Sequence, residues 1–242
     1  AYTLAGLVFF IFLKPDPLLV ARAIVVNDET KSKTPNTDHS QPQTQRTGVM
    51  IGATVLILSH IVMVGIMTMT PVHMEHHGSG LSAVGLVIGL HIAAMYLPSL
   101  ITGSLVDKIG RMKMVIASAL TLTASGVLAA LVPGESVVFI TISLILLGLG
   151  WNFGLISGTA IVVDSTTVQN RAKIQGSIDV GVAIGGSAGS ILSSFIFAYS
   201  SYTILGFVGA YLSFMLIPVI LWVNMKRKNA IMTNTNTKTS SM

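Results

Sequence analysis

The sequence predicts an all-α membrane protein, a bundle of six transmembrane helices preceded by the end of another helix. Of its 242 residues, 52% are hydrophobic and only 10% are charged, and the mean hydropathy is +0.77. Soluble domains usually carry about 25% charged residues. Apolar stretches of membrane-spanning length recur along the chain, and the basic residues fall on alternate connections between them. Lipid is therefore the expected solvent for most of the chain.

Six apolar stretches have the length that a helix needs to cross a bilayer core, about 20 residues for about 30 Å. They are Val49–Thr70, Leu81–Val106, Met114–Val132, Ser136–Val163, Ile174–Tyr199 and Tyr202–Val223. Backbone polar groups in lipid must be bonded within their own segment, so each stretch is predicted to be a helix. These runs are too long and too continuously apolar for the alternating strands of a membrane barrel.

The chain opens with a seventh apolar run, Ala1–Leu13, which is about a third too short to span. It starts on Ala rather than Met, so we expect the end of a truncated helix. Residues 14–47 are predicted to be a cytoplasmic linker, because Asn27–Gln45 is rich in polar residues and Pro. The predicted six-helix domain covers residues 48–225 and a cytoplasmic tail covers 226–242.

The positions of the basic residues predict the orientation of the chain. All fourteen fall on alternate connections: Lys14, Arg22, Lys31, Lys33, Arg46, then Lys108, Arg111, Lys113, then Arg171, Lys173, then Lys226, Arg227, Lys228, Lys238. The positive-inside rule assigns these connections to the cytoplasmic side of the cell membrane. A net charge of +5 would also suit nucleic acid, but short clusters between apolar runs argue against such binding. Without cysteine, disulfides and thiolate metal sites are excluded.

One predicted connection carries a motif. It reads Gly103-Ser104-Leu105-Val106-Asp107-Lys108-Ile109-Gly110-Arg111-Met112-Lys113. Physical chemistry alone predicts a tight basic turn, in which Asp107 caps the next helix, Gly110 permits the turn and Arg111 stays at the membrane face. An ordinary positive-inside loop with an Asp cap remains an alternative.

This motif resembles the signature cytoplasmic loop of the major facilitator superfamily. The matching positions are Gly103, Leu105, Asp107, Lys108, Gly110 and Arg111. The sequence departs from the pattern at Met112, where the family usually has a basic residue, and Lys113 comes one place late. The resemblance implies that the linker is the central loop between two halves. The six helices would then be helices 7 to 12, Ala1–Leu13 the end of helix 6, and the partner a missing N-terminal six-helix half.

The resemblance also implies a gating role for this connection. In the family, the Asp and Arg of the motif hold the cytoplasmic side closed through charge pairs and release it as the halves rock. Asp164, at the end of the fourth span, is the expected ion-pair partner of Arg111, with Arg171 nearby. The simpler alternative is a solvated charge at the rim. The gating set is Gly103, Asp107, Lys108, Gly110, Arg111, Asp164 and Arg171.

Polar residues at membrane depth are costly and therefore candidates for function. The candidates for a cavity or a proton site are His60, His91, Trp151, Asn152 and Asp179. His60 and His91 are candidate proton carriers, because a histidine titrates near physiological pH. Asp179 is a third candidate, because it is an ionisable residue at membrane depth. Each has a structural alternative: helix packing for the two histidines, a bond across helices for Asn152, and an anchoring pair with Lys173 or Arg171 for Asp179.

Two further patterns have mainly structural interpretations. Glycines at a spacing of four predict close helix packing: Gly150, Gly154, Gly158, Gly181, Gly185 and Gly189. The run His73-Met74-Glu75-His76-His77 has the composition of a zinc site, but it is short and has no supporting residues nearby, so a solvated loop is favoured and no metal is expected.

The predicted function is secondary active transport of a small solute by alternating access, with proton-coupled export favoured. No phosphate-binding loop is present, which argues against a self-contained ATP-driven pump, and no cofactor is expected. A non-transporting receptor or accessory protein is an alternative. A membrane enzyme is less favoured, because His60, His91 and Asp179 are scattered and no nucleophile signature accompanies them.

Overall fold

The computed structural model describes residues 42–131 and 136–218. The expected helix end at residues 1–13, most of the linker and the tail lie outside these residues. The helices are α3 (Pro42–His76), α4 (Leu81–Tyr96), α5 (Ser99–Ile109), α6 (Arg111–Leu131), α7 (Val137–Asp164), α8 (Val168–Tyr199) and a last helix, Tyr202–Pro218. The described part of the chain contains no strand.

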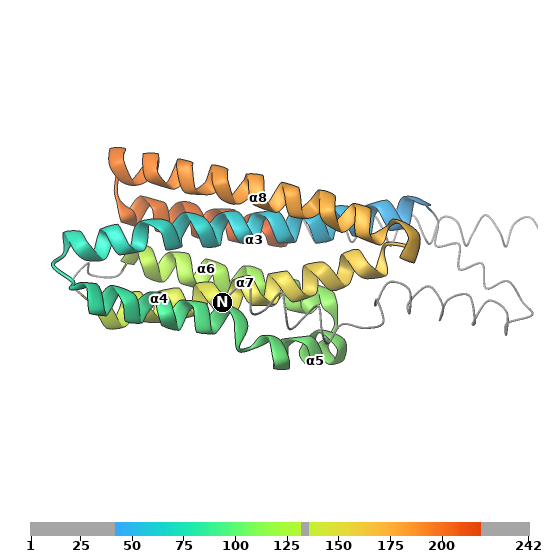
Figure 1. Ribbon diagram of the computed structural model, residues 1–242, viewed down its shortest axis with the longest axis horizontal. Helices are drawn as coiled ribbons and strands as arrows, with labels where there is room; N and C mark the ends of the chain where they lie inside the picture. Colours follow the sequence, from blue (N-terminus) through green and yellow to red (C-terminus); the bar gives the residue numbers. More distant parts are fainter. Residues whose placement is uncertain (1–41, 132–135, 219–242) are drawn as a thin grey trace, which may run out of the picture.

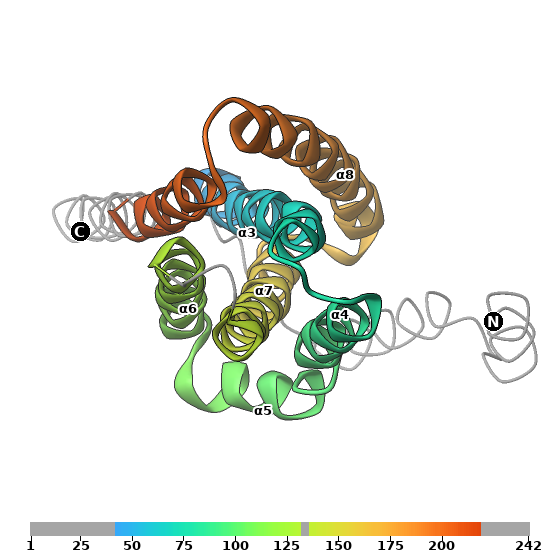
Figure 2. The ribbon, with the colours of Figure 1, turned by 90° about the vertical axis from the view of Figure 1, so that its left-hand side faces the viewer.

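The helices run along one common direction and form a bundle (Figure 1). Viewed down that direction, α3 and α7 lie at the centre, with α8 on one side and α4 with α5 on the other (Figure 2). The last helix and α6 lie together on a third side. The largest core cluster joins α3, α4, α6, α7 and the last helix through residues such as Ile66, Met95, Leu122, Trp151 and Leu205.

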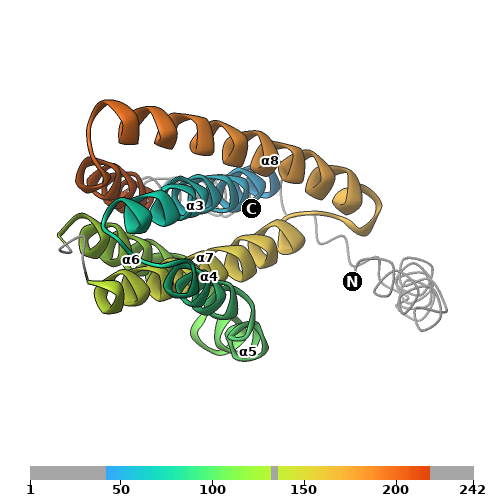
Figure 3. The same ribbon diagram turned by 60° about the vertical axis from the view of Figure 1, so that its left-hand side comes forward.

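With the bent pair α4 and α5 counted as one span, successive spans run in opposite directions, so the connections between spans alternate between the two ends (Figure 3). The start of α3, the α5–α6 turn and the α7–α8 turn share one end. We call this the basic end, because it holds the Lys and Arg residues of the described chain: Arg46, Lys108, Arg111, Lys113, Arg171 and Lys173. The alternation read from the sequence is therefore present in three dimensions.

By length and composition, α3, α6, α7 and α8 are each long and apolar enough to cross a membrane. The pair α4 and α5 makes a fifth span if its two helices are counted together. The last helix is also apolar, but its described part, Tyr202–Pro218, is shorter than the helices that are long enough to cross a membrane. In the most apolar stretch of α8, only 17% is buried inside the protein, against 50% in each of α3, α6 and α7. This low burial fits the position of α8 on the outside of α3.

The predicted span Leu81–Val106 is two helices rather than one. α4 ends at Tyr96, α5 begins at Ser99, and the two axes differ by 40°. The physical cause is Pro98, which has no N–H and whose ring clashes with the preceding turn. The sequence is apolar on both sides of Pro98, so the length of the apolar run predicted one helix and did not indicate the break.

The first span is longer at both ends than the apolar run Val49–Thr70. α3 begins at Pro42, within the predicted linker, and continues through Pro71 to His76. The residues from His73 to His76 are therefore helical rather than part of a loop. Burial of Met74, which is 0% exposed among Val87, Ile140 and Leu144, explains why the helix persists beyond the proline.

The glycines predicted to pack helices lie at close contacts. A Cβ at Gly154 would come 2.8 Å from Ser118 Oγ, and a Cβ at Gly189 would come 3.0 Å from the Ile61 carbonyl oxygen. The closest mutual approach lies elsewhere, between α6 and the last helix. There a Cβ on Gly126 would lie 2.7 Å from the Gly206 oxygen, and a Cβ on Gly206 would lie 2.8 Å from the Gly126 oxygen.

Candidate functional site

Arg111 and Asp164 form an ion pair at the basic end. Arg111 Nη2 donates to Asp164 Oδ1 at 3.0 Å. Arg111 Nε lies 2.6 Å from Oδ2, although this second contact does not have the alignment of a hydrogen bond. The two side chains are 41% and 45% exposed. The structure thus brings together the two residues for which the sequence predicted a pair.

The ion pair joins two helix ends whose dipoles oppose the charges that they carry. Arg111 is the first residue of α6, where the helix dipole is positive, and Asp164 is the last residue of α7, where it is negative. Each side chain is therefore unfavourable on its own helix and is offset by the other. Arg171 of α8 also binds this end of α7, because its Nη2 donates to the Val163 carbonyl at 3.2 Å.

The other motif residues shape the α5–α6 turn. Gly110 has a φ of 101°, a backbone conformation that favours glycine, and its N–H closes α5 by donating to the Val106 carbonyl. Lys108 and Asp107 are exposed, and Gly103 has open space around it. Within the described residues Asp107 makes no hydrogen bond or ion pair, so the cap expected from the sequence is not formed.

His60 and Trp151 meet across α3 and α7. The Trp151 Nε1–H donates to His60 Nδ1 at 3.2 Å. The Trp151 ring also meets Tyr96 edge to face, with the ring centroids 6.0 Å apart. His60 has room because α8 carries Gly186 beside it: a Cβ there would come 2.8 Å from the histidine ring. His60, Trp151 and Tyr96 thus form a ring cluster that joins α3, α7 and α4, and Gly186 of α8 packs against it.

Asn152 is bonded to the break between α4 and α5. It is fully buried, and its Nδ2 donates to the Met95 carbonyl and to Ser99 Oγ, each at 2.8 Å. Its Oδ1 accepts from Thr102 Oγ1 at 2.7 Å. All three partners lie around Pro98, where the helical ladder is interrupted. Asn152 therefore replaces part of the lost helical bonding.

His91 is also fully buried, between α4 and α7. Its Nδ1 lies 2.7 Å from the Leu144 carbonyl, so the neutral ring carries its proton on Nδ1. The other ring nitrogen, Nε2, is buried and has no partner in the described structure. His60, His91 and Asn152 each belong to a separate set of contacts in this structure, and their grouping around one cavity stays a prediction.

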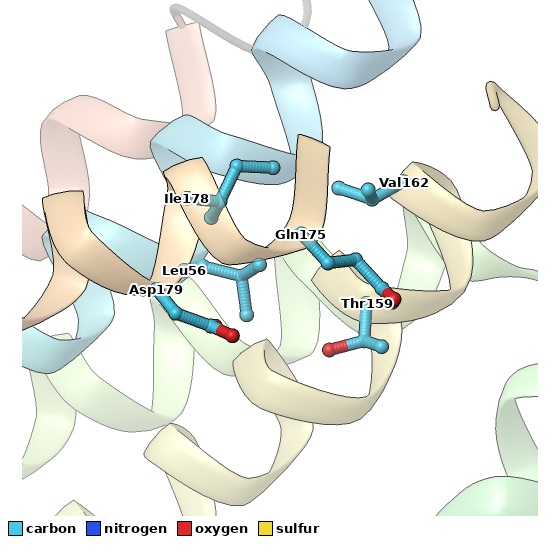
Figure 4. Close-up of a pocket in the computed structure, with 6 residues that line it drawn as sticks. All are labelled: Leu56, Thr159, Val162, Gln175, Ile178 and Asp179. Atoms are coloured by element: carbon cyan, nitrogen blue, oxygen red, sulfur yellow. The ribbon is translucent and has the colours of Figure 1, made fainter. Parts of the chain in front are cut away.

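Asp179 lies apart from these residues, in a pocket bounded by α3, α7 and α8 (Figure 4). The residues that line it are Leu56, Thr159, Val162, Gln175, Ile178 and Asp179. The anchoring pair considered for Asp179 does not form, since the salt bridge between Arg111 and Asp164 is the only one among the described residues.

The histidines near the opposite end make ring contacts with neighbouring helices. His73 stacks on Tyr202, with centroids 4.1 Å apart, and the Tyr202 hydroxyl is hydrogen-bonded to Thr70 at 2.8 Å. His77 lies against His73, and His76 meets Phe197. No group of three or more His, Asp or Glu residues in the described ranges is placed to hold a metal ion.

Comparison with known proteins identifies the family. The family model described as Major Facilitator Superfamily matches residues 49–238. The chain belongs to the major facilitator superfamily. This agrees with the motif at Gly103–Arg111 and with the helical membrane bundle seen in the structure.

Members of the superfamily with similar sequences include two proteins of Bacillus subtilis. The uncharacterized MFS-type transporters YdeG and YddS are 57% and 54% identical to this chain, each over 92% of it. These matches cover 52% and 51% of the two proteins, so the chain spans about half the length of the curated relatives it matches. The riboflavin transporter RfnT of Brucella anthropi is 36% identical over 51% of this chain and 30% of its own length.

Several residues of these sites were missed by the sequence interpretation. Ser99 and Thr102 are bonded to Asn152, and Thr159 and Gln175 share the pocket of Asp179. Pro98, in the middle of an apolar run, was an available signal for the first pair, since a break in a membrane helix leaves backbone groups that need partners. No local pattern marks Thr159 and Gln175, because their meeting depends on how α7 and α8 are packed.

Proposed function

We propose that the protein is a secondary active transporter that exports a small organic solute from the cell in exchange for protons. This chain forms its C-terminal six-helix half, with the basic end in the cytoplasm. The observation that carries the proposal is the Arg111–Asp164 ion pair within the family's signature turn. Membership of a superfamily of transporters, together with this turn, favours transport over a receptor, accessory or enzymatic role.

The gating step follows from the position of the pair. Alternating access requires one end of the two halves to open while the other closes. In the closed state, Arg111 and Asp164 tie the start of α6 to the end of α7. If α6 and α7 shift relative to each other during the transport cycle, the pair separates and each charge faces the unfavourable dipole of its own helix. This favours closing again, so the pair acts as a reversible latch at the cytoplasmic end.

Asp179 and His60 are the residues proposed to take up the proton. His60 lies on α3 and Asp179 on α8, and neither side chain forms an ion pair among the described residues. The hydrogen bond from Trp151 leaves His60 Nδ1 unprotonated, so a proton gained there would displace this bond. Protonation of His60 would thereby change a contact between α3 and α7.

The nature of the cargo is supported by one relative. RfnT is named as a riboflavin transporter, and riboflavin is a small organic molecule. This supports an organic solute rather than an inorganic ion as the cargo of the present protein.

The test is solute flux in vesicles made from cells that express the complete gene. Inverted vesicles energised with an acidic interior should accumulate solutes that vesicles without the protein exclude. A protonophore should abolish this accumulation, and Asp179→Asn should reduce it while the exposed-site control Glu75→Gln should not. Accumulation that persists unchanged with the protonophore would overturn proton coupling, and an absence of flux across a broad panel of solutes would overturn transport.

A further inference from the structure

The pocket around Asp179 has a cavity volume of about 250 Å³ and two chemically different parts. Its apolar part consists of Leu56, Val162 and Ile178, which are 8%, 1% and 7% exposed. Its polar part consists of Thr159 on α7 with Gln175 and Asp179 on α8, and Figure 4 shows these side chains directed toward the same space. Small-molecule sites commonly combine apolar walls with a few polar groups in this way.

The polar groups of the pocket have unused hydrogen-bonding capacity. Within the described residues the side chains of Thr159, Gln175 and Asp179 make no hydrogen bond to each other or to any other group. The threonine is informative, because threonines inside membrane helices usually bond to their own backbone. Six threonines in the described helices donate to the carbonyl four residues earlier, namely Thr68, Thr70, Thr102, Thr121, Thr123 and Thr141. The hydroxyl of Thr159 makes no such bond.

The charge of the pocket is negative and uncompensated. Asp179 forms no ion pair in the described structure. The basic residues nearest to it in sequence, Arg171 and Lys173, do not contact its carboxylate. Arg171 binds the end of α7, and Lys173 is exposed. The Asp179 carboxylate, the Thr159 hydroxyl and the amide oxygen of Gln175 are all acceptors. Asp179 itself is exposed, Thr159 and Gln175 are half-buried, and the buried Leu56, Val162 and Ile178 form the apolar side of the pocket.

We propose that this pocket binds a protonated amine of an organic solute, with the ammonium group at Asp179 and a short apolar tail against Leu56, Val162 and Ile178. An ammonium group offers three N–H donors, which matches three acceptors on two helices. The cavity has room for an apolar tail as well as the charge and lies below the usual volume of sites for drug-sized ligands, about 300–1,000 Å³. The inference rests on the proposed transport of a small organic solute and names its class.

The proposal is tested by ligand-dependent thermal stability of the purified protein, produced from its complete gene. n-Butylammonium chloride is the probe, and n-butanol is its uncharged counterpart. Sodium chloride and choline chloride at equal ionic strength control for the charge, since choline carries no N–H. A ligand that binds only the folded protein raises the melting temperature with concentration. We expect a rise with n-butylammonium that exceeds the effects of the other three compounds.

Variants locate the binding site. Asp179→Asn should abolish the n-butylammonium shift, and Thr159→Val and Gln175→Leu should each weaken apparent affinity several-fold. Glu75→Gln removes one carboxylate at an exposed position of α3, away from the pocket, and should leave the shift intact. If Asp179→Asn does not fold, loss of affinity in the other two variants is the deciding result.

Three results would overturn the amine site: no shift in the unsubstituted protein, a shift that survives in all three pocket variants, or an equal shift with sodium that Asp179→Asn removes. The last would indicate a site for an inorganic cation. Because the measurement does not require flux, its outcome is separate from that of the transport assay. A protein that binds the amine without moving any solute would contradict transport alone.

Discussion

Arg111 and Asp164 connect the first residue of α6 to the last residue of α7, with Nη2 and Oδ1 3.0 Å apart. The two residues are 53 positions apart in sequence. Each places its charge at the end of a helix where the dipole disfavours that charge. Their contact is therefore a stabilising interaction for each helix end as well as a link between the two.

The first prediction concerns this link. Arg111→Ala and Asp164→Ala should each change the transport rate several-fold, and the double variant should resemble the stronger single variant. The coupling should be about 0.2–1 kcal/mol, because both side chains are partly exposed and water screens the pair. Arg111→Lys should fall between, since lysine keeps the charge without the two-pronged contact. Strictly additive effects in this double-mutant cycle would show that the pair does not act as a unit.

The second prediction concerns Asn152. Asn152→Leu would leave the Met95 carbonyl, Ser99 and Thr102 without this partner in the protein interior. Unsatisfied buried polar groups cost about 1–3 kcal/mol each, so the melting temperature should fall by several degrees. Ser187→Ala is the control, because Ser187 is exposed and bonds only to its own helix. An unchanged melting temperature in Asn152→Leu would mean that the break does not depend on Asn152.

The third prediction concerns Pro98. Pro98→Ala restores the missing N–H and should reduce the 40° bend between α4 and α5. The chain has no cysteine, so spin labels can be attached at cysteines introduced for the purpose, at the exposed residues Ser82 and Ser104. Pulsed electron paramagnetic resonance should then show a longer distance in the alanine variant. A second label pair on α8, at Ser177 and Ser194, should keep its distance.

The fourth prediction compares glycines with and without neighbours. Gly126→Ala and Gly206→Ala place a methyl group within 2.8 Å of backbone atoms on the facing helix. Such overpacking typically costs about 1–3 kcal/mol, so both variants should lower the melting temperature. Gly89→Ala and Gly176→Ala are matched controls, because a Cβ at either position meets nothing within 4 Å. Alanine favours helix over glycine by about 1 kcal/mol, so the controls should be neutral or stabilised. Equal effects at all four positions would contradict the observed packing.

The fifth prediction concerns His91. His91→Leu removes one bond to the Leu144 carbonyl, a loss of about 0.6 kcal/mol for bonds between membrane helices. It also removes the buried, unpartnered Nε2, which relieves a cost of similar or greater size. We therefore expect unchanged or slightly higher thermal stability and an unchanged pH dependence of transport. A shift of the pH profile in this variant would return His91 to the proton carriers.

Much of the fold could be predicted from the sequence because its causes are local. The transfer of an apolar run into lipid and the closure of its backbone hydrogen bonds depend on that run alone. The spans beginning near Met114 and Ser136 therefore correspond to α6 and α7 within a few residues, and the apolar run Val49–Thr70 lies within the longer α3. The predicted pairing of Arg111 and Asp164 had a similar basis, because the alternation of connections puts both residues at the same end of the bundle.

The candidate cavity could not be predicted in the same way. Polarity at membrane depth identified His91, Asn152 and Asp179 as unusual, but it carries no information on which way each side chain faces. In the structure, Asn152 faces the break at Pro98, His91 faces a carbonyl of α7, and Asp179 faces a pocket. These directions depend on the rotation of each helix about its own axis.

The sequence by itself determined that this chain is a helical membrane protein and which connections of the described helices share an end. Only the tertiary structure decided that the second span is broken and held by Asn152, and that Thr159 and Gln175 join Asp179 in one pocket. The physical reason is the range of the interactions. Partition into lipid is summed over neighbouring residues, whereas a pocket requires side chains from helices far apart in sequence to meet at one depth and on facing sides.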